Sequence, residues 1–553
     1  MSSVTLTSVS GGAGAGVFDA QDREHGGFVK SGREVIHIQV GKAGNNIGHE
    51  FWRDLCEEHG VSYDGTSNRE LAGHVVQCKN NPTACEDRMD TFFNEGSKNK
   101  EGRRRWVPRC ILVDTNMQDL SQIAGDVGLG ELYRPDNIIG NDEGSGNCYA
   151  KAFHTEGPDL AERVLEVVRK EVERCSCLQG VQFTHAVSGG TGSGLTGLLV
   201  TMLNDYLSAS AAGKCIIQTW TVLPGPRSLD MLLAPYNSCL ALEDLVENAD
   251  MVYCFDNTAL QDICTKFQDM ETPKFNHMNN IIACCMSGLT SCLRYSGPLN
   301  ADLRKLHTNL VPFPKNHFLI NGFAPLTPPN AVGYRNLNVK DLAQQMMSRD
   351  SVSVKCDPLC AGDPDQGIPK ARFLASWASW RGDWKAQEVD EVHHWLQKDG
   401  SRYDKFFPDW IPNSIGSNIC TQPHCDKGKS VTFVSNSTAI HEVFDRTLSK
   451  FYQMYKKKSF LSKFEEEGVS ADDMLESAKC LEYISDQYKH WASKEDKILD
   501  GQGFSINEKC VQTDEERSIA EWLSELAGPY GDGGMCIEMR DTARMPGASG
   551  GYR

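Results

Sequence analysis

The 553-residue sequence predicts an α/β fold in which a doubly wound parallel sheet is followed by a second, intermediate α/β domain and by C-terminal helices. Apolar runs of strand length alternate with helix-length amphipathic runs between residues 33 and 260. Glycine clusters stand at three of the strand-to-helix junctions in that region. After it the strands become widely spaced, which places a central helix and intermediate domain at residues 261–435 and a helical region at residues 436–495.

Composition and charge exclude several classes of function. Hydrophobic residues make up 40% and charged residues 24% of the chain, as in an ordinary globular protein. The net charge of −18 argues against nucleic acid as a partner, because phosphate-binding surfaces need an excess of basic residues. The chain has no apolar run long enough to cross a membrane and no secretory signal at its start, so we expect a cytosolic protein without a membrane partner.

The 21 cysteines are an odd number and are scattered through apparent core segments, as at Cys284-Cys285. This distribution favours buried, reduced thiols over a disulfide framework. Cys420, His424 and Cys425 are close enough in sequence to raise the hypothesis of a metal site, although no second ligand pair stands at zinc-finger spacing.

The chain is organised around Ser188–Gly194, which reads S-G-G-T-G-S-G. The alternating apolar run Val181–Val187 predicts a strand before it, and Leu195–Leu207 predicts a helix after it. Glycines let a backbone approach a ligand where no Cβ fits, and a helix N-terminus offers unpaired N–H groups to an anion. The stretch is therefore interpreted as a phosphate cradle. The stretch matches neither the dinucleotide-binding motif G-x-G-x-x-G nor the P-loop motif G-x-x-x-x-G-K-[S/T]. The alternative to a phosphate cradle is a glycine turn without a binding function.

Two more units of strand, glycine loop and helix support the cradle. The first has a predicted strand at Val35–Val40, a loop at Gly41–Gly44 and a helix at Asn45–His59. The second has a glycine loop at Glu143–Asn147 ahead of a helix at Pro158–Glu173. Loops that follow parallel strands meet at one edge of the sheet, so we expect all three to converge on a nucleotide.

The remaining elements complete the predicted order. The strand Cys110–Asp114 ends in an acid at the edge where a parallel sheet presents a carboxylate to a ligand or metal. Further strands are predicted at Cys215–Leu223 and Met251–Asp256, each followed by a helix. The segments predicted after these are a helix at Phe275–Tyr295, strands at Phe318–Ile320, Phe373–Trp380 and Val431–Val434, an exposed loop at Asp357–Arg372, and amphipathic helices at Ser437–Lys457 and Ala471–Lys494. Residues 1–32 predict a disordered extension, and residues 496–553 a mostly disordered tail with one short helix.

From about Arg33 to Lys494 the chain resembles the tubulin superfamily, and β-tubulin more than the other members. The resemblance rests on R-E-V-I-H-I-Q-V-G-K-A-G-N-N-I-G, S-G-G-T-G-S-G, L-N-A-D-L-R-K-L and N-L-V-P-F-P-K, in that order. It implies GTP or GDP with Mg²⁺ as cofactors. It also implies an α-type tubulin as longitudinal partner, neighbouring tubulins in a lattice and microtubule-associated proteins.

The resemblance also implies the binding residues, position by position. Asp230 resembles a residue of the sugar-binding loop, and Asn257 and Asn279 resemble the side chains that read guanine. An asparagine amide offers both a donor and an acceptor and so matches a guanine edge. Phe275 stands where the family stacks a ring on the base, with an ordinary core phenylalanine as the alternative. The implied phosphate-binding residues are Gly41, Lys42, Ala43, Asn46, Gly144, Ser145, Gly146, Asn147, Ser188, Gly189, Gly190, Thr191 and Gly192, and the magnesium position is expected near Asp114 and Asn116.

Lys305 indicates which kind of member this is. In the family, a subunit's GTP is hydrolysed when the next subunit's L-N-x-D-L loop inserts above it, and α-type loops bring a glutamate that positions water. Here the segment is Leu299–Lys305, with Lys305 at the glutamate position. An ammonium cannot act as that carboxylate base at neutral pH, so the chain is expected to leave its neighbour's nucleotide unhydrolysed, as β-type subunits do. An ordinary solvated lysine is the alternative.

The pocket departs from the family's pattern at three positions. Lys42 replaces a glutamine, Asn116 an acid and Ala234 a glutamate, and each change makes the formal charge of the pocket more positive by one. Asp142 and Glu143 offset part of this change. The resulting hypothesis is that guanine nucleotide still binds, with altered magnesium dependence and slower hydrolysis or exchange.

Surface segments of the chain also depart from the family's pattern. A longer segment with Trp522, Leu523 and Leu526 at helical spacing replaces the family's polyglutamate tail and is able to dock a partner. This tail, the insertion at Asp357–Arg372 and the extension before Gly32 are each interpreted either as specialised contacts or as neutral loop growth.

Together these features predict a guanine-nucleotide-binding structural subunit of microtubules in a specialised array, such as a cilium or basal body, within the cytoplasmic cytoskeleton. A regulatory or centriolar binding protein that keeps the fold without entering a lattice is the alternative. A Rossmann-type oxidoreductase fails because G-x-G-x-x-G with its following acid is missing.

Overall fold

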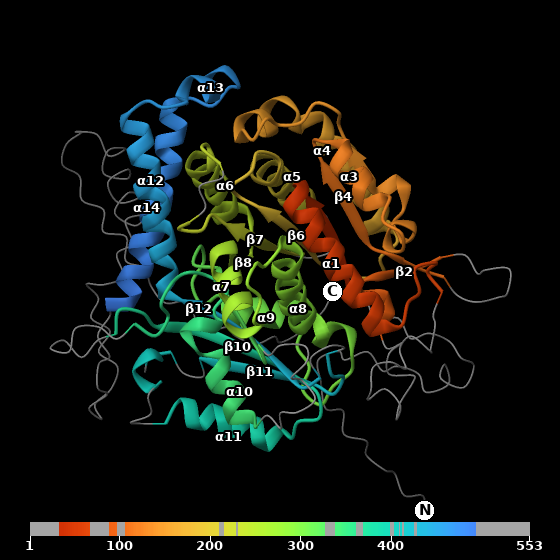
Figure 1. The fold of residues 1–553 in the computed structure, drawn as a ribbon, viewed down its shortest axis with the longest axis vertical. Helices are drawn as coiled ribbons and strands as arrows, with labels where there is room; N and C mark the ends of the chain where they lie inside the picture. Colours follow the sequence, from red (N-terminus) through yellow and green to blue (C-terminus); the bar gives the residue numbers. More distant parts are fainter. Residues whose placement is uncertain are drawn as a thin grey trace, which may run out of the picture. The chain divides into compact units, whose positions relative to one another are not determined.

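The computed structural model shows the fold in Figure 1. Asp230, Cys425, the predicted N-terminal extension and the tail with Trp522, Leu523 and Leu526 lie outside the part of the chain that it describes. The structure describes residues 33–66, 88–96, 105–209, 215–227, 231–326, 338–360, 369–398, 403–408, 410–411, 414–424 and 428–493.

Among the described residues, ten strands form one sheet in the order β11-β10-β12-β9-β8-β7-β6-β1-β4-β5. All pairs from β5 across to β9 are parallel, whereas β12 runs antiparallel to both of its neighbours. The strands of this sheet are β1 (Glu34–Val40), β4 (Cys110–Asp114), β5 (Ile138–Gly140), β6 (Leu178–Ala186), β7 (Ile216–Leu223), β8 (Met251–Asp256), β9 (Phe318–Ala324), β10 (Phe373–Arg381), β11 (Ile415–Cys420) and β12 (Ser430–Ser437). A separate hairpin pairs β2 (Phe93–Glu95) with β3 (Trp106–Pro108).

The chain reverses direction across the sheet next to β1. It passes from β1 outward to β4 and β5, and then returns to place β6 on the other side of β1. Ligands of doubly wound folds bind at this point, because loops that leave neighbouring strands in opposite directions open a crevice at the carboxyl edge.

Helices cover both faces of the sheet (Figure 1). On the β1 strand, Ile36 and Ile38 face α4 and α5, while Val35 faces the core with α1, α3 and α8, as the two-residue period of a strand requires. The helices are α1 (Gly41–His59), α3 (Met117–Ala124), α4 (Gly157–Glu173), α5 (Thr196–Ala209), α6 (Ala234–Asn248), α7 (Asn257–Phe267), α8 (Phe275–Arg294), α9 (Leu303–Leu310), α10 (Val339–Met346), α11 (Ala386–Leu396), α12 (His441–Lys456), α13 (Leu461–Glu466) and α14 (Ala471–Ser493).

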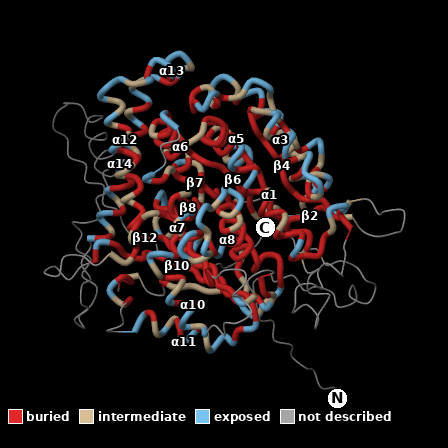
Figure 2. Tube along the Cα trace, viewed as in Figure 1, coloured by how far each residue is buried: buried red, intermediate tan, exposed pale blue. Residues whose placement is uncertain are grey.

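The predicted fold class is confirmed. The parallel half of the sheet carries the glycine loops, and β9 to β12 with α10 and α11 form the second α/β part around its own hydrophobic cluster. Helices α12 and α14 pack on α6, as Figure 1 shows, and their apolar faces form another buried cluster. Figure 2 shows that burial is concentrated in the sheet and α8, while α11 and α13 carry more exposed residues.

Four details of the predicted elements are wrong. Gly41–Gly44 is not a loop, because α1 begins at Gly41, whose φ of 73° makes the turn out of β1 in a single residue. Helical structure likewise begins inside the S-G-G-T-G-S-G stretch, as a π-helical turn at Thr191–Leu195. Strand β11 was not predicted, because its G-S-N-I-C sequence lacks an apolar alternation.

The fourth correction concerns the ends of Asp357–Arg372, which was predicted to be an exposed loop and whose residues 361–368 lie outside the described part of the chain. Residues 357–360 are buried or partly buried, and Arg372 is only 2% exposed. The backbone N–H of Arg372 donates to the hydroxyl of Thr438 at 2.8 Å, and the Thr438 N–H donates back to the Arg372 carbonyl at 2.9 Å. These bonds tie the segment to the start of the C-terminal helices.

The cysteine prediction is confirmed among the residues that the structure describes. Each described cysteine is a free thiol, and most of them, including Cys284 and Cys285, are buried. Within the same residues, no helix is both long and apolar enough to span a membrane.

Candidate nucleotide site

The three predicted glycine stretches follow β1, β5 and β6 and meet at the carboxyl edge of the sheet. A Cβ on Gly41 would lie 3.2 Å from the backbone nitrogen of Gly192, so the start of α1 and the stretch after β6 touch. A Cβ on Gly190 would lie 2.6 Å from Oγ of Ser145. Three segments far apart in sequence therefore form one surface made mainly of backbone.

The glycines serve two different purposes. Gly190 and Gly192 are needed for close packing, because a Cβ on Gly192 would lie 2.6 Å from the carbonyl oxygen of Ala186. At Gly144, Gly146 and Gly189, in contrast, a Cβ would meet nothing within 4 Å. Open space beside bare backbone is what a cradle for a phosphate chain requires.

The loop after β5 contains three residues with positive φ, a backbone conformation that also occurs in anion-binding nests. Gly144, Gly146 and Asn147 have φ values of 70°, 57° and 56°. Left-handed residues among right-handed ones turn successive N–H groups toward a common point, where they attract negative charge. Asn147 is the non-glycine member of this group, and asparagine tolerates the left-handed region better than most side chains.

Thr191 joins the three strands' loops through its hydroxyl. Its Oγ1 lies 2.6 Å from Oγ1 of Thr115 after β4 and 3.1 Å from Oγ of Ser145. All three hydroxyls are buried. This cluster fixes the spacing between the cradle segments before any ligand binds.

Two asparagines that the sequence reasoning missed brace the backbone. Asn45, buried in α1, donates through Nδ2 to the carbonyls of Gly41 at 2.9 Å and Val113 at 3.0 Å. Asn237, buried in α6, donates to the carbonyls of Asn147 at 2.9 Å and Ser188 at 3.1 Å. Asn45 could have been found as a polar residue on the apolar side of its helix, whereas Asn237 carries no local signal.

Asp114, at the end of β4, lies in the floor of the site. It is 3% exposed, and its Oδ1 accepts a bond from the backbone N–H of Asn116 at 3.3 Å. Its Oδ2 is buried and has no hydrogen-bond partner among the described residues. Burial raises the pKa of this carboxyl to about 6. A buried oxygen without a donor is suited to a cation, so Asp114 fits the magnesium that the resemblance implies.

Lys42 and Asn116 are both engaged with Asp119 of α3. Lys42 Nζ lies 2.9 Å from Oδ1 of Asp119, and Asn116 Nδ2 donates to Oδ2 at 3.3 Å. Asn116 is also the N-cap of α3, accepting from the Gln118 N–H at 3.1 Å. The carboxylate of Asp119 therefore offsets the positive charge of Lys42, a compensation that the sequence comparison of the pocket did not consider.

The predicted base-contacting residues lie on helices that follow β8. Asn257 begins α7, and Asn279 lies on α8 with 9% exposure. Phe275, the first residue of α8, is 65% exposed, so the alternative of an ordinary core phenylalanine is wrong. Ala234 begins α6 and is buried.

The remaining predicted phosphate residues lie on the same segments. Lys42, Ala43 and Asn46 are exposed in the first turns of α1. Ser188 and Gly189 are partly buried after β6. The structure thus brings together the members of the three glycine stretches.

A doubly wound sheet with a backbone cradle at its switch point defines a nucleotide-binding protein of the α/β class. Family comparison narrows this class. The model of the Tubulin/FtsZ family GTPase domain matches residues 34–265, and that of the Tubulin C-terminal domain matches residues 314–449. The two matches cover about two thirds of the chain and follow each other in order, and the chain belongs to the tubulin superfamily. It is a GTP-binding protein of the cytoskeletal tubulin fold.

Proposed function

We propose that the chain is a β-like tubulin that binds guanine nucleotide at this site and pairs longitudinally with an α-type tubulin. Family membership supports assembly with other tubulins. The β-like assignment depends on one position, Lys305.

Lys305 lies on α9 and is exposed to solvent. Its Nζ lies 5.8 Å from the centroid of the Trp377 ring, within the range of a cation–π contact. Asp302, the N-cap of the same helix, is paired with Arg33 at 2.6 Å. A surface helix that presents an ammonium in place of a carboxylate offers no base to a neighbour's nucleotide.

Within its own site we propose that the three glycine stretches hold the phosphates and that Asn257 and Asn279 read the guanine edge. Phe275 supports this proposal, because an exposed aromatic ring at a helix start is available to stack on a base. Asp230 is proposed to contact the sugar by resemblance alone. Asp114 and Asn116 would hold magnesium, which neutralises phosphate charge when bound.

The departures of the pocket support a specialised array, such as a cilium or basal body, rather than bulk microtubules. Lys42 pairs with Asp119 of α3, and Asn116 caps the same helix. Both substituted residues therefore connect the proposed phosphate site to α3. We propose that they alter the magnesium dependence of nucleotide binding.

The first experiment is to denature the purified protein and to identify and count the released nucleotide by chromatography. About one guanine nucleotide per chain is expected, since the three glycine stretches of the described residues form a single cradle. An empty chain, with the fold intact by circular dichroism, would contradict nucleotide binding and move the non-lattice binding protein to first place.

The second experiment mixes the protein with an α-type tubulin and GTP, and follows polymer sedimentation and phosphate release. We expect co-assembly without hydrolysis of the α-subunit's nucleotide, and we expect Lys305→Glu to restore that hydrolysis. Arg304→Glu, an equal charge change on the neighbouring exposed residue, is the matched control and should not restore it. Failure to co-assemble would contradict the lattice function.

A further inference from the structure

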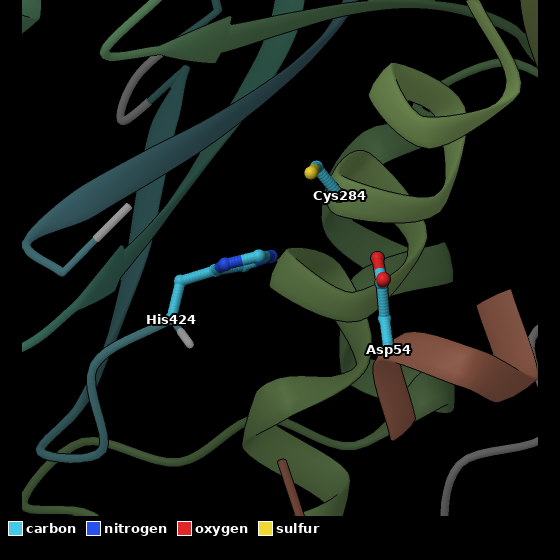
Figure 3. A group of neighbouring side chains, drawn as sticks. All are labelled: Asp54, Cys284 and His424. Carbon is cyan, nitrogen blue, oxygen red and sulfur yellow. The ribbon is translucent and has the colours of Figure 1, made fainter. Parts of the chain in front are cut away.

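A second group of buried polar side chains lies beside the C-terminal half of α1 (Figure 3). Asp54 of α1, Cys284 of α8 and His424 of the turn between β11 and β12 point toward one another. Their potential ligand atoms all lie within 4.8 Å of one another, and all three residues are buried. These residues are separated by more than a hundred positions in sequence at each step, so only the fold brings them together.

We propose that Asp54, Cys284 and His424 form a binding site for a divalent transition metal of the zinc class. A thiolate, an imidazole and a carboxylate are the three ligand types that Zn²⁺ takes in proteins, and a mixed set of this kind disfavours Mg²⁺ and Ca²⁺, which prefer oxygen alone. Three protein ligands leave a fourth tetrahedral position for water.

The spacing is close to what a metal needs. Ligands about 2.0 to 2.3 Å from a tetrahedral ion stand roughly 3.3 to 3.8 Å from one another. The ligand atoms here lie within 4.8 Å, so a contraction of about 1 Å closes the site. Rotation of the short Cys284 and Asp54 side chains about their χ1 torsions provides movements of this size.

The charges of the three ligands match a divalent ion. The carboxylate of Asp54 and the thiolate of Cys284 carry two negative charges, and the imidazole of His424 is neutral when it ligates. Binding releases the thiol proton to water, so the metal-bound group is electrically neutral overall. A neutral group is compatible with burial, where an uncompensated charge is costly.

The surrounding residues hold the ligands in place. The backbone of His424 exchanges two hydrogen bonds with Gly428, at 3.0 and 2.9 Å, which closes the turn that carries the imidazole. Oε1 of Glu58 lies 3.9 Å from Nε2 of His424, so a carboxylate stands beside the ring, as it commonly does beside ligating histidines.

Two buried arginines near the site share the single carboxylate of Glu58. Arg294 lies 2.6 Å and Arg381 2.8 Å from the carboxylate oxygens of Glu58. Burial by itself would raise the pKa of Glu58, but the two arginines hold this pKa well below its usual range.

The test uses the full chain, stripped of loosely bound metal by a chelator and titrated with Co²⁺ as a spectroscopic substitute for Zn²⁺. We expect one cobalt per chain with a thiolate-to-cobalt charge-transfer band, which magnesium-type oxygen sites around the nucleotide cannot give. Zn²⁺ should displace the cobalt and abolish the band.

Variants assign the ligands. Cys284→Ala should abolish the band, and Asp54→Asn and His424→Ala should each weaken cobalt binding more than about tenfold, since losing even a supporting partner of a ligand costs that much. Cys285→Ala is the matched control, because the next helical position points about 100° away, and it should keep the band. Released guanine nucleotide, counted for each variant, reports whether the variant is folded.

Two outcomes would overturn the proposal. The first is a wild-type chain, folded and loaded with nucleotide, that gives no charge-transfer band. The second is a band that survives Cys284→Ala but is lost in Cys420→Ala or Cys425→Ala, which would assign the metal to the Cys420, His424 and Cys425 cluster instead.

Discussion

The two halves of α1 serve two sites by opposite means. At its first residue, Gly41, the helix contributes bare backbone to a cradle that opens to solvent. From Asp54 to His59 it contributes charged and polar side chains to the interior, where Glu58 is 4% exposed and faces two buried arginines. A helix start can bind an anion through N–H groups that every residue carries, whereas a helix interior can bind only through particular side chains.

The difference explains which site is visible in the sequence. The cradle needs glycines at fixed local spacing, so it leaves a motif at each strand end. The buried end of α1 needs one residue from each of several distant segments, and none of them is unusual where it stands. Substitutions can therefore separate dependence on particular buried side chains from dependence on space around the backbone.

The largest effect is expected for Glu58→Gln. Removing this carboxylate leaves Arg294 and Arg381 buried without their counter-charge, which destabilises the fold by about 3 to 5 kcal/mol. Chemical denaturation measures the loss. Glu57→Gln, an exposed neighbour on the same helix, is the control and should change the free energy of unfolding by less than about 0.5 kcal/mol. Equal effects of the two changes would show that the buried network does not stabilise the fold.

The cradle should depend on backbone space instead. Gly190→Ala places a methyl group 2.6 Å from Oγ of Ser145 and 2.7 Å from the nitrogen of Cys148, and should cost about 1 to 3 kcal/mol of stability. Gly189→Ala meets nothing within 4 Å and should leave the free energy of unfolding of the nucleotide-free protein nearly unchanged. Thermal unfolding of both variants, stripped of nucleotide, makes the comparison. A similar loss in both would mean that the segments are not packed as described.

A pH effect is expected from Asp244 of α6, which accepts a hydrogen bond from the Tyr149 hydroxyl at 2.7 Å beside the cradle. Burial raises the pKa of its carboxyl from 3.8 to about 7. The folded protein thus binds this proton more tightly than the unfolded chain, so the resulting stabilisation is full below pH 3.8 and is lost as pH rises through about 7.

Asp244→Asn should remove that dependence, because an amide does not titrate but still accepts the tyrosine bond. The difference in melting temperature between the variant and the wild type should therefore grow in the variant's favour from pH 4 to pH 7. A constant difference across this range would contradict the raised pKa.

The smallest effect is expected for Lys42→Gln. Its pair with Asp119 is exposed on the lysine side, with 67% of that side chain accessible, so its loss should change the free energy of unfolding by less than about 1 kcal/mol. Its effect on magnesium dependence is the informative one. We expect nucleotide release at low magnesium to increase, and an unchanged release rate would remove Lys42 from the phosphate site.

Much of the fold could be predicted from the sequence because its signals are local. The apolar runs of β1, β4 and β8 and the apolar face of α8 predicted elements within a few residues of those observed. Strand β11 was missed because it is a short edge strand whose I-G-S-N-I-C sequence has no apolar alternation. The start of α1 was misplaced because the sequence does not show that Gly41 alone makes the turn.

The sequence by itself determined the family, the doubly wound sheet and the backbone cradle, because glycines and strand patterns act over a few neighbouring residues. The tertiary structure decided which side chains meet. It paired Lys42 with Asp119, placed Asn237 beneath two cradle loops, and brought His424 to Asp54 and Cys284. Contacts between distant segments depend on the packing of whole helices and strands, and no single stretch of sequence records them.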